Sequence, residues 1–300
     1  ELEADKLGIR YIIKSKYDAG GSYRFLNRLN ELTKVSAKND RDIISSIFAT
    51  HPKTIDRIKA SKVNIKNNID VITNREIYLE AIDGMIYGDN SQHGIIKDYN
   101  FYHLELNFSF IVPKNYTIIN NKNNVISYNE NKEVVVIFDG LLNEDDLSLL
   151  ELAEFYYLRS NINLYKEIII DNKTSIVFEE NKTVKYDGNE YFRKTYLINW
   201  GDNRVWRFSL LLKPQVQSNY IGEADKIAKS IHELREEEKI LARPNFISIL
   251  KTKKGDTPLL LSKKMALNKN QLEILLIMNG LTIQSDEQIS EGTLIKMIVN

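Results

Sequence analysis

The sequence contains no cysteine and only 4 histidines among its 300 residues. Without cysteine, the protein forms neither disulfides nor Cys-ligated zinc or iron–sulfur sites, so His, Asp and Glu are its remaining metal ligands. The 41 basic and 41 acidic side chains cancel. No global field of the kind that gathers nucleic acid or an anionic membrane surface follows from this composition, and we expect no nucleic-acid partner.

Long apolar runs are also missing. No segment approaches the roughly 20 apolar residues that span a bilayer, and no basic and then apolar leader stands at the start of the sequence. We therefore expect no transmembrane segment in this chain, and we expect any signal peptide to lie upstream of Glu1. The 43% of hydrophobic residues suffices for a buried core, and the length predicts roughly two folding units or more.

The apolar spacing is helical up to about residue 85. A first helix is predicted over residues 1–18, ending before Gly20-Gly21, and a second is predicted to begin at Ser22 as its cap. Thr50 is placed to cap a third helix, with Pro52 near its first turn. A fourth helix is predicted over residues 74–88.

From about residue 94 the spacing changes to a period of two, which predicts strands. The segment "YHLELNFSFIV" predicts one strand over 102–112, with His103 opposite its apolar row in a rim or turn-stabilising role. Asp187-Gly188 predicts a hairpin turn. Residues 218–239 predict one closing helix, with His232 on its polar face. Sheet and helices together predict an α+β fold.

Arg243-Pro244 marks a second boundary, and the tail beyond it predicts a strand, two helices and a strand. Asp256 or Thr257 is expected to cap the first of these helices, and Asn279-Gly280 to end the second.

Candidate chemistry lies at the start of the chain, where Glu1 and Asp5 project from one helical face. An acidic first turn has a plain structural explanation, since it stabilises a helix N-terminus by up to about 1 kcal/mol. No two histidines are spaced i, i+4, so the zinc helix His-Glu-x-x-His is not in this sequence. His51, followed by Pro52, stands in a helix N-cap region, where both a structural and a site role are open.

The segments "ELEADKLGIRYIIKSKYD…YRFLNRL" and "ATHPKTIDRI" closely resemble the end of the catalytic domain of the CAAX-prenyl-protease-like zinc metallopeptidases (peptidase family forty-eight), in particular the bacterial BepA/LoiP-like branch. The resemblance implies that Glu1 is the third zinc ligand, and that Asp5 orients a zinc-bound histidine. The two zinc histidines and the catalytic glutamate are absent and are expected upstream of Glu1.

The resemblance also implies roles for the histidine-proline segment. His51 is expected to reach the site, either stabilising the oxyanion or occupying the open position on zinc as a removable plug. Arg57 is expected to hold a substrate carbonyl or Asp5. In the full-length protein one zinc ion would activate water and polarise the scissile carbonyl, whereas the chain as it stands is expected to bind little metal and to lack proteolysis.

Three domains follow from the resemblance: the last helices of a gluzincin protease domain (1–88), a PsbP-like α+β sheet domain (89–240) and a LysM-like βααβ module (244–300). The implied function is a zinc endopeptidase of the periplasm or cell envelope that acts on unfolded or misassembled proteins. The alternative is a non-catalytic envelope adaptor that binds protein partners and peptidoglycan. Against wall binding, Phe246 is the tail's only aromatic residue for stacking on sugars.

Overall fold

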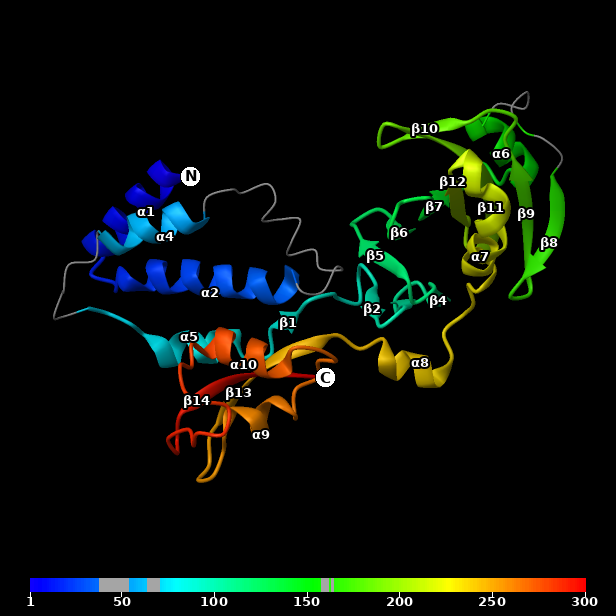
Figure 1. Ribbon diagram of the computed structural model, residues 1–300. Helices are drawn as coiled ribbons and strands as arrows, with labels where there is room; N and C mark the ends of the chain where they lie inside the picture. Colours follow the sequence, from blue (N-terminus) through cyan, green and yellow to red (C-terminus); the bar gives the residue numbers. More distant parts are fainter. Residues whose placement is uncertain (38–53, 64–70, 158–161, 163–164) are drawn as a thin grey trace. The chain divides into compact units, whose positions relative to one another are not determined.

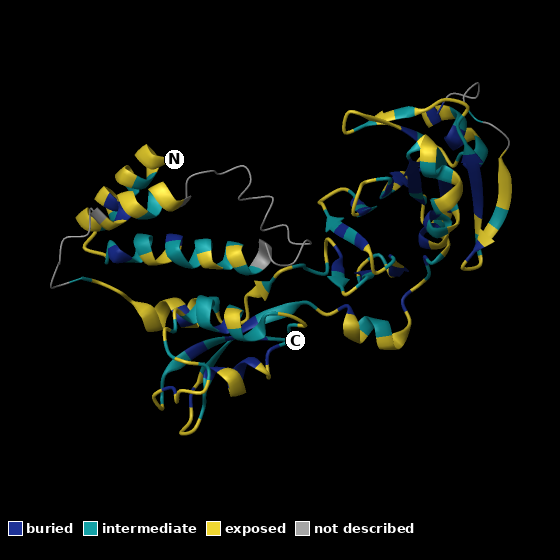
Figure 2. Cartoon of the chain, viewed as in Figure 1, coloured by how far each residue is buried: buried dark blue, intermediate teal, exposed yellow. Residues whose placement is uncertain are grey.

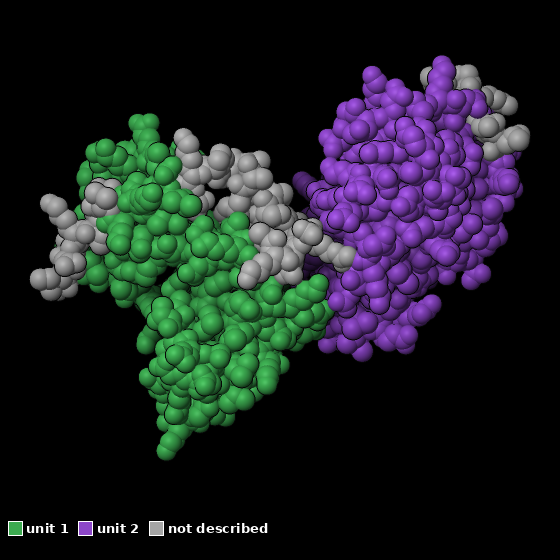
Figure 3. All heavy atoms as spheres, in the orientation of Figure 1, with its two compact units in different colours: residues 1–88, 245–300 green, residues 89–244 purple. Residues whose placement is uncertain are grey.

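The computed structural model describes residues 1–37, 54–63, 71–157, 162 and 165–300. The chain divides into two compact units, residues 1–88 with 245–300 (unit 1) and residues 89–244 (unit 2), which Figure 3 colours separately. The protein is α+β, and its sheets are antiparallel. The first and last segments of the chain thus share one unit, whereas the sequence predicts three consecutive domains.

Unit 1 combines helices with a small sheet of three strands (Figure 1). Its described helices are α1 (Leu2–Lys14), α2 (Gly20–Ala37), α4 (Thr54–Val63), α5 (Arg75–Ile82), α9 (Pro258–Ser262) and α10 (Gln271–Asn279). Its strands are β1 (Ile86–Tyr87), β13 (Asn245–Lys251) and β14 (Leu294–Val299), in the order β1-β13-β14. Because β1 pairs with β13, the end of the N-terminal segment becomes part of the C-terminal sheet.

Unit 2 is built on a larger antiparallel sheet, in the order β5-β6-β7-β12-β11-β9-β8 with β10 paired to β11, and on a separate three-stranded sheet, β2-β3-β4. The strands are β2 (Ile95–Lys97), β3 (Asn100–His103), β4 (Phe108–Ile111), β5 (Tyr116–Asn120), β6 (Val125–Asn129), β7 (Val134–Leu142), β8 (Lys166–Ile170), β9 (Lys173–Glu179), β10 (Val184–Tyr186), β11 (Asn189–Gly201) and β12 (Arg204–Leu212). The described helices are α6 (Leu149–Tyr157), η2 (Pro214–Val216), α7 (Gln217–Lys229) and α8 (Glu236–Leu241).

The core of unit 2 follows from the alternation of side chains along the central strands. Tyr196 and Ile198 of β11 pack with α7 and with the aromatic side chains of β3 and β4. Leu197, between them, lies on the other face and packs with α6. The central strands of the sheet are therefore buried on both faces and are dark blue in Figure 2, whereas β8 is largely exposed and β10 partly exposed. At Gly140 a Cβ would overlap the ring of Trp206, so the absence of a side chain there lets this buried indole pack against β7.

Several local predictions are confirmed. Asp187 and Gly188 form the β10–β11 hairpin turn, both with positive φ. Thr257 caps α9, its Oγ1 accepting the Leu260 N–H at 3.2 Å. Gly280 ends α10 in the left-handed conformation, and the tail runs strand, helix, helix, strand as predicted.

Others are wrong. The predicted strand 102–112 is a hairpin, because Asn107 turns the chain with positive φ (53°) and the Leu106 N–H bonds His103 Nδ1 at 3.2 Å. His103 therefore has the turn-stabilising role that was one of its two predicted alternatives. The second helix begins at Gly20 rather than after a Ser22 cap, since Asp18 Oδ1 accepts the Gly20 N–H at 2.8 Å. The predicted cap Thr50 and Pro52, predicted near the first turn of the same helix, lie outside the described residues.

The predicted closing helix 218–239 is also interrupted. α7 ends at Lys229, and residues 231–235 form an irregular segment before α8. Within it His232 exchanges both backbone hydrogen bonds with Ser109 of β4, at 2.9 and 3.0 Å. His232 is thus not on the polar face of a helix, because cross-bridging to a distant strand outweighs the local helical preference of the segment.

Candidate functional site

Arg57 joins the two acidic residues that the sequence analysis singled out. It lies in the first turns of α4, whereas Glu1 and Asp5 stand at the N-terminal end of α1. Its Nε and Nη2 donate to the two carboxylate oxygens of Asp5 at 2.6 and 2.9 Å. Its Nη1 lies 3.6 Å from Glu1 Oε2. We call these three residues the acidic–arginine cluster.

The helix geometry explains why both carboxylates reach one guanidinium. Glu1 is the N-cap residue of α1, and its carbonyl accepts the Asp5 N–H at 2.9 Å, so the two side chains lie one turn apart on the same face. α4 packs beside that face. Because the guanidinium fork matches a carboxylate in geometry, Arg57 binds Asp5 through both oxygens and contacts Glu1 with its remaining nitrogen.

The electrostatics of the cluster keep Asp5 ionised. The hydrogen bonds from Arg57 lower the pKa of Asp5 below its usual value, against the opposing effect of burial. The same hydrogen bonds raise the pKa of Arg57. The side chains of Asp5 and Arg57 are 18% and 21% exposed, whereas that of Glu1 is 40% exposed. The cluster therefore presents one accessible carboxylate, Glu1, backed by a fixed ion pair.

Of the predicted site residues, the structure brings together Glu1, Asp5 and Arg57. For Arg57, the two predicted partners were a substrate carbonyl and Asp5, and the structure shows the contact with Asp5. A part of Arg57 in catalysis stays a prediction. His51 lies outside the described residues, so its roles as ligand, plug or oxyanion donor stay predictions too. Among the described residues, no group of three or more His, Asp or Glu side chains is arranged to hold a metal ion. The donor set described here, a single carboxylate, does not fit a complete zinc site.

We expect the Arg57–Asp5 pair to hold α1 and α4 together. Replacing Arg57 by glutamine leaves a partly buried carboxylate without its charged partner, which costs about 1–2 kcal/mol. Hydrogen exchange measured by mass spectrometry should show roughly tenfold faster exchange in both helices.

The matched control for this variant is Arg24→Gln, which removes an ion pair to Asp18 whose arginine is 52% exposed. Exposed pairs of this kind contribute about 0–1 kcal/mol, so exchange in α1 and α4 should change less than about threefold. Equal increases in hydrogen exchange in the two variants would show that the Arg57–Asp5 pair stabilises α1 and α4 no more than an exposed ion pair does.

A second constellation, Ser109, His232 and Glu238, has the residue types of a hydrolase triad without its geometry. His232 Nε2 lies 3.1 Å from Ser109 Oγ and 3.0 Å from Glu238 Oε1, so both groups share one ring nitrogen. A catalytic triad needs the carboxylate on the other nitrogen. Here Nδ1 donates to the carbonyl of Ser230 at 2.7 Å, and Ser109 is 1% exposed. The three side chains hold α8 and its preceding segment against β4.

A small cavity of about 120 Å³ lies beside His103 in unit 2, lined by aromatic side chains such as Phe108 and Trp206. Ligand sites for small molecules usually measure about 300–1,000 Å³, so this cavity is too small for most substrates.

Among the helices in the described part of the chain, none has the length and apolar character needed to cross a membrane.

No protein-family model and no curated protein sequence matches the chain. Among solved structures it is similar to the PsbP protein (CyanoP) of Synechocystis sp. PCC 6803, with 12% identity, 49% of this chain and 98% of that chain covered, and a TM-score of 0.37. It is also similar to the Ran-binding protein Mog1p of Saccharomyces cerevisiae (8% identity, 48% and 98% covered, TM-score 0.31) and to LpqN of Mycobacterium tuberculosis (7% identity, 43% and 83% covered, TM-score 0.31). Similarity at this level says nothing about activity or ligands.

Proposed function

We propose that this chain is the C-terminal part of a zinc-dependent endopeptidase of the bacterial cell envelope, which acts on unfolded or misassembled proteins. The observation that carries the proposal is the acidic–arginine cluster. Glu1, Asp5 and Arg57 are three of the four residues to which the resemblance assigns site roles. Arg57, 52 positions from Asp5 in the sequence, donates two hydrogen bonds to the Asp5 carboxylate and lies 3.6 Å from the Glu1 carboxylate.

The geometry of the cluster is consistent with the proposed roles of Asp5 as the carboxylate that orients a histidine and of Glu1 as a metal ligand. A carboxylate that orients a zinc-bound histidine must stay ionised to accept the imidazole N–H, and Arg57 lowers the pKa of Asp5 accordingly. A carboxylate that binds metal must be accessible, and Glu1 is the most exposed of the three side chains. The proposal places two histidines and a catalytic glutamate in the protein N-terminal to Glu1. Zinc, when bound there, would lower the pKa of a water molecule and polarise the scissile carbonyl of the substrate.

The exposed apolar surface of α1 also supports the proposal. Ile9 is the buried residue of this helix, whereas Tyr11 is 64% exposed, Leu2 45% and Leu7 41%. Figure 2 shows α1 and α4 as largely exposed helices. Apolar side chains in this number on one short helix are what a helix presents when further protein packs against it. We propose that the rest of the peptidase domain covers them.

The finer assignments of the other segments belong to the same proposal. The βααβ order of residues 245–299, with β13 and β14 antiparallel, supports a LysM-like module. The antiparallel sheet of unit 2, with helices on its faces, supports a PsbP-like domain. We propose that both place the peptidase near its protein partners or the cell wall in the periplasm or envelope, with peptidoglycan as a candidate ligand of the tail.

The proposal is tested by the metal content of two purified proteins, the full-length protein and the chain of residues 1–300. We expect about one zinc per full-length molecule, together with cleavage of unfolded casein that a chelator abolishes, and neither in the shorter chain, which lacks the histidine pair. A full-length protein without zinc and without chelator-sensitive cleavage would leave the non-catalytic adaptor as the function.

A further inference from the structure

Four cations line one pocket of unit 1. The pocket measures about 530 Å³ and is bounded by α2, α5, the end of α10 and β14. Arg24 and Arg28 come from α2, Arg75 from the start of α5 and Lys296 from β14, and no Asp or Glu is among the residues that line it. We call it the basic pocket.

Two of these cations, Arg28 and Lys296, have neither a carboxylate nor a hydrogen-bond acceptor as a side-chain partner in the described part of the chain. Arg24 is paired with Asp18 at 2.5 Å, and Arg75 donates to the carbonyl of Leu294 at 3.0 Å. For Arg28 and Lys296, no ion pair to a described carboxylate exists. Burial, and then the positive charges of Arg28 and Arg75, lower the pKa of Lys296. The positive charges of Arg28, Arg75 and Lys296 repel one another, and a bound anion would offset this repulsion.

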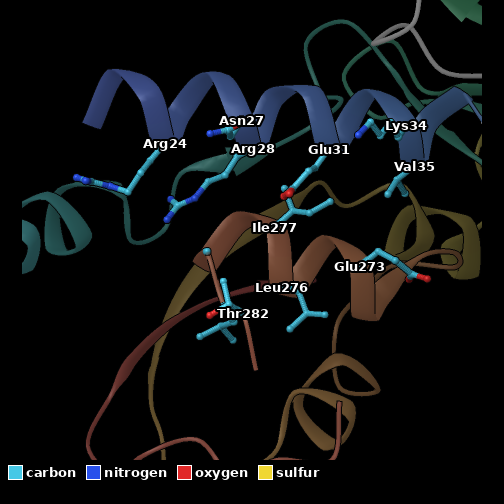
Figure 4. A pocket seen from close by; sticks show the side chains of 12 residues that line it. Arg24, Asn27, Arg28, Glu31, Lys34, Val35, Glu273, Leu276, Ile277 and Thr282 are labelled. Carbon is cyan, nitrogen blue, oxygen red and sulfur yellow. The ribbon is translucent and has the colours of Figure 1, made fainter. Parts of the chain in front are cut away.

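The fold holds the two unpaired cations in place. Asn279, at the end of α10, bonds the backbone of Lys296 twice, accepting its N–H at 2.7 Å and donating to its carbonyl at 2.9 Å. Arg28 extends from α2 toward the end of α10 (Figure 4), where its guanidinium occupies the space that a Cβ on Gly280 would fill. Both positions thus depend on the Asn279-Gly280 pair.

Structural stabilisation accounts for only part of this arrangement. The C-terminal end of a helix favours one nearby cation, and Arg28 has that position at α10. The end of α10 does not compensate for the charge of Lys296 as well. Lys296 is half-buried on β14, and its strand neighbours Ile295 and Met297 are buried. A half-buried lysine raises the free energy of the folded state unless its ammonium group is paired with an anion.

We propose that the basic pocket binds a phosphate group, in the form of a phosphate monoester or inorganic phosphate. The guanidinium of Arg28 supplies a fork of donors and Lys296 a point charge, which is the usual pair for phosphate recognition. A dianion balances two unpaired cations, whereas a carboxylate balances one. Phe25 and Tyr78, exposed at the wall of the pocket, offer apolar surface for the organic part of an ester.

The test is titration calorimetry of the 300-residue chain with inorganic phosphate and with glycerol phosphate, at constant ionic strength. We expect saturable binding of at least one of them, about tenfold tighter than acetate. Lys296→Met, which keeps the length of the side chain, and Arg28→Gln should each weaken it about tenfold, the loss expected for one charge-assisted hydrogen bond. The matched control is Lys34→Met, which removes an α2 cation that does not line the pocket and should change affinity less than twofold.

The outcomes distinguish specific phosphate binding from non-specific attraction between charges. They also show whether the phosphate belongs to a soluble ester or to a lipid headgroup. Equal weakening by all three variants, equal affinity for acetate, or no saturable binding would each overturn the proposal. Tighter binding of glycerol phosphate than of inorganic phosphate would identify a soluble ester. Binding to vesicles that contain phosphatidic acid, lost in Lys296→Met, would identify a lipid headgroup. Arg28→Gln serves as a second variant if Lys296→Met does not fold.

Discussion

Replacing Glu1 by glutamine in the full-length protein is expected to lower the rate of casein cleavage at least about 100-fold. The physical reason is that an amide is a much weaker zinc ligand than a carboxylate, and that zinc with two protein ligands is held loosely. Zinc content measured on the same sample should fall with activity, whereas the fold should persist, because Glu1 contributes no side-chain cap to α1.

Glu3→Gln is the matched control for this prediction. Glu3 is an exposed acidic residue in the same first turn of α1, so the variant makes the same change of charge two residues away. Its activity should stay within about twofold, as is typical of a surface substitution. Full activity and full zinc content in Glu1→Gln would remove Glu1 from the site.

Unit 2 is expected to lose stability as pH falls, because of His103. Burial, and then the charge of His93, lower the pKa of His103 from 6.5 to about 4. Since the folded pKa lies below the unfolded one, the stabilising contribution is complete above pH 6.5, declines as pH falls and is lost at about pH 4. A shift of this size corresponds to about 3 kcal/mol.

Both tryptophans, Trp200 and Trp206, belong to unit 2, so urea unfolding followed by tryptophan fluorescence reports this unit selectively. In His103→Asn the dependence on pH between 6.5 and 4 should be flatter than in the unmodified protein, although the loss of ring packing lowers stability at neutral pH. His93→Asn, which changes an exposed histidine, should keep most of the dependence. An unchanged pH dependence in His103→Asn would refute the assignment.

Local features of the fold were predictable where the chemistry is local. Asp187-Gly188 marks a turn because both positions adopt positive φ. Asn279-Gly280 and Thr257 likewise mark helix ends through their own backbone or side chain. The central strands of the large sheet are buried on both faces, so they are recognisable as short apolar runs such as "EVVVIF" and not as strict alternation.

Features that depend on distant partners were missed. Alternation across 102–112 hid the turn at Asn107, because a hairpin can keep the same apolar pattern as one strand. The break around His232 depends on Ser109, more than 100 residues away. The pairing of β1 with β13, which places residues 86 and 87 in the C-terminal sheet, has no local signal at all.

The candidate site shows the same division. The one-turn spacing of Glu1 and Asp5 was readable from the sequence, whereas the choice of Arg57 between Asp5 and a substrate carbonyl required the packing of α4 on α1. The basic pocket was missed, although one signal existed: Lys296 interrupts the apolar strand "LIKMIV". A charge in such a strand is costly without a partner, and only the assembled unit shows that Arg28 and Arg75 come near it.

X-ray absorption at the zinc edge, recorded on the full-length protein and on its Glu1→Gln variant, tests the role of Glu1 most directly. Our account predicts two imidazole nitrogens and a carboxylate oxygen around zinc, with the oxygen contribution reduced or the metal lost in the variant. An identical spectrum and equal zinc content in the two proteins would contradict it.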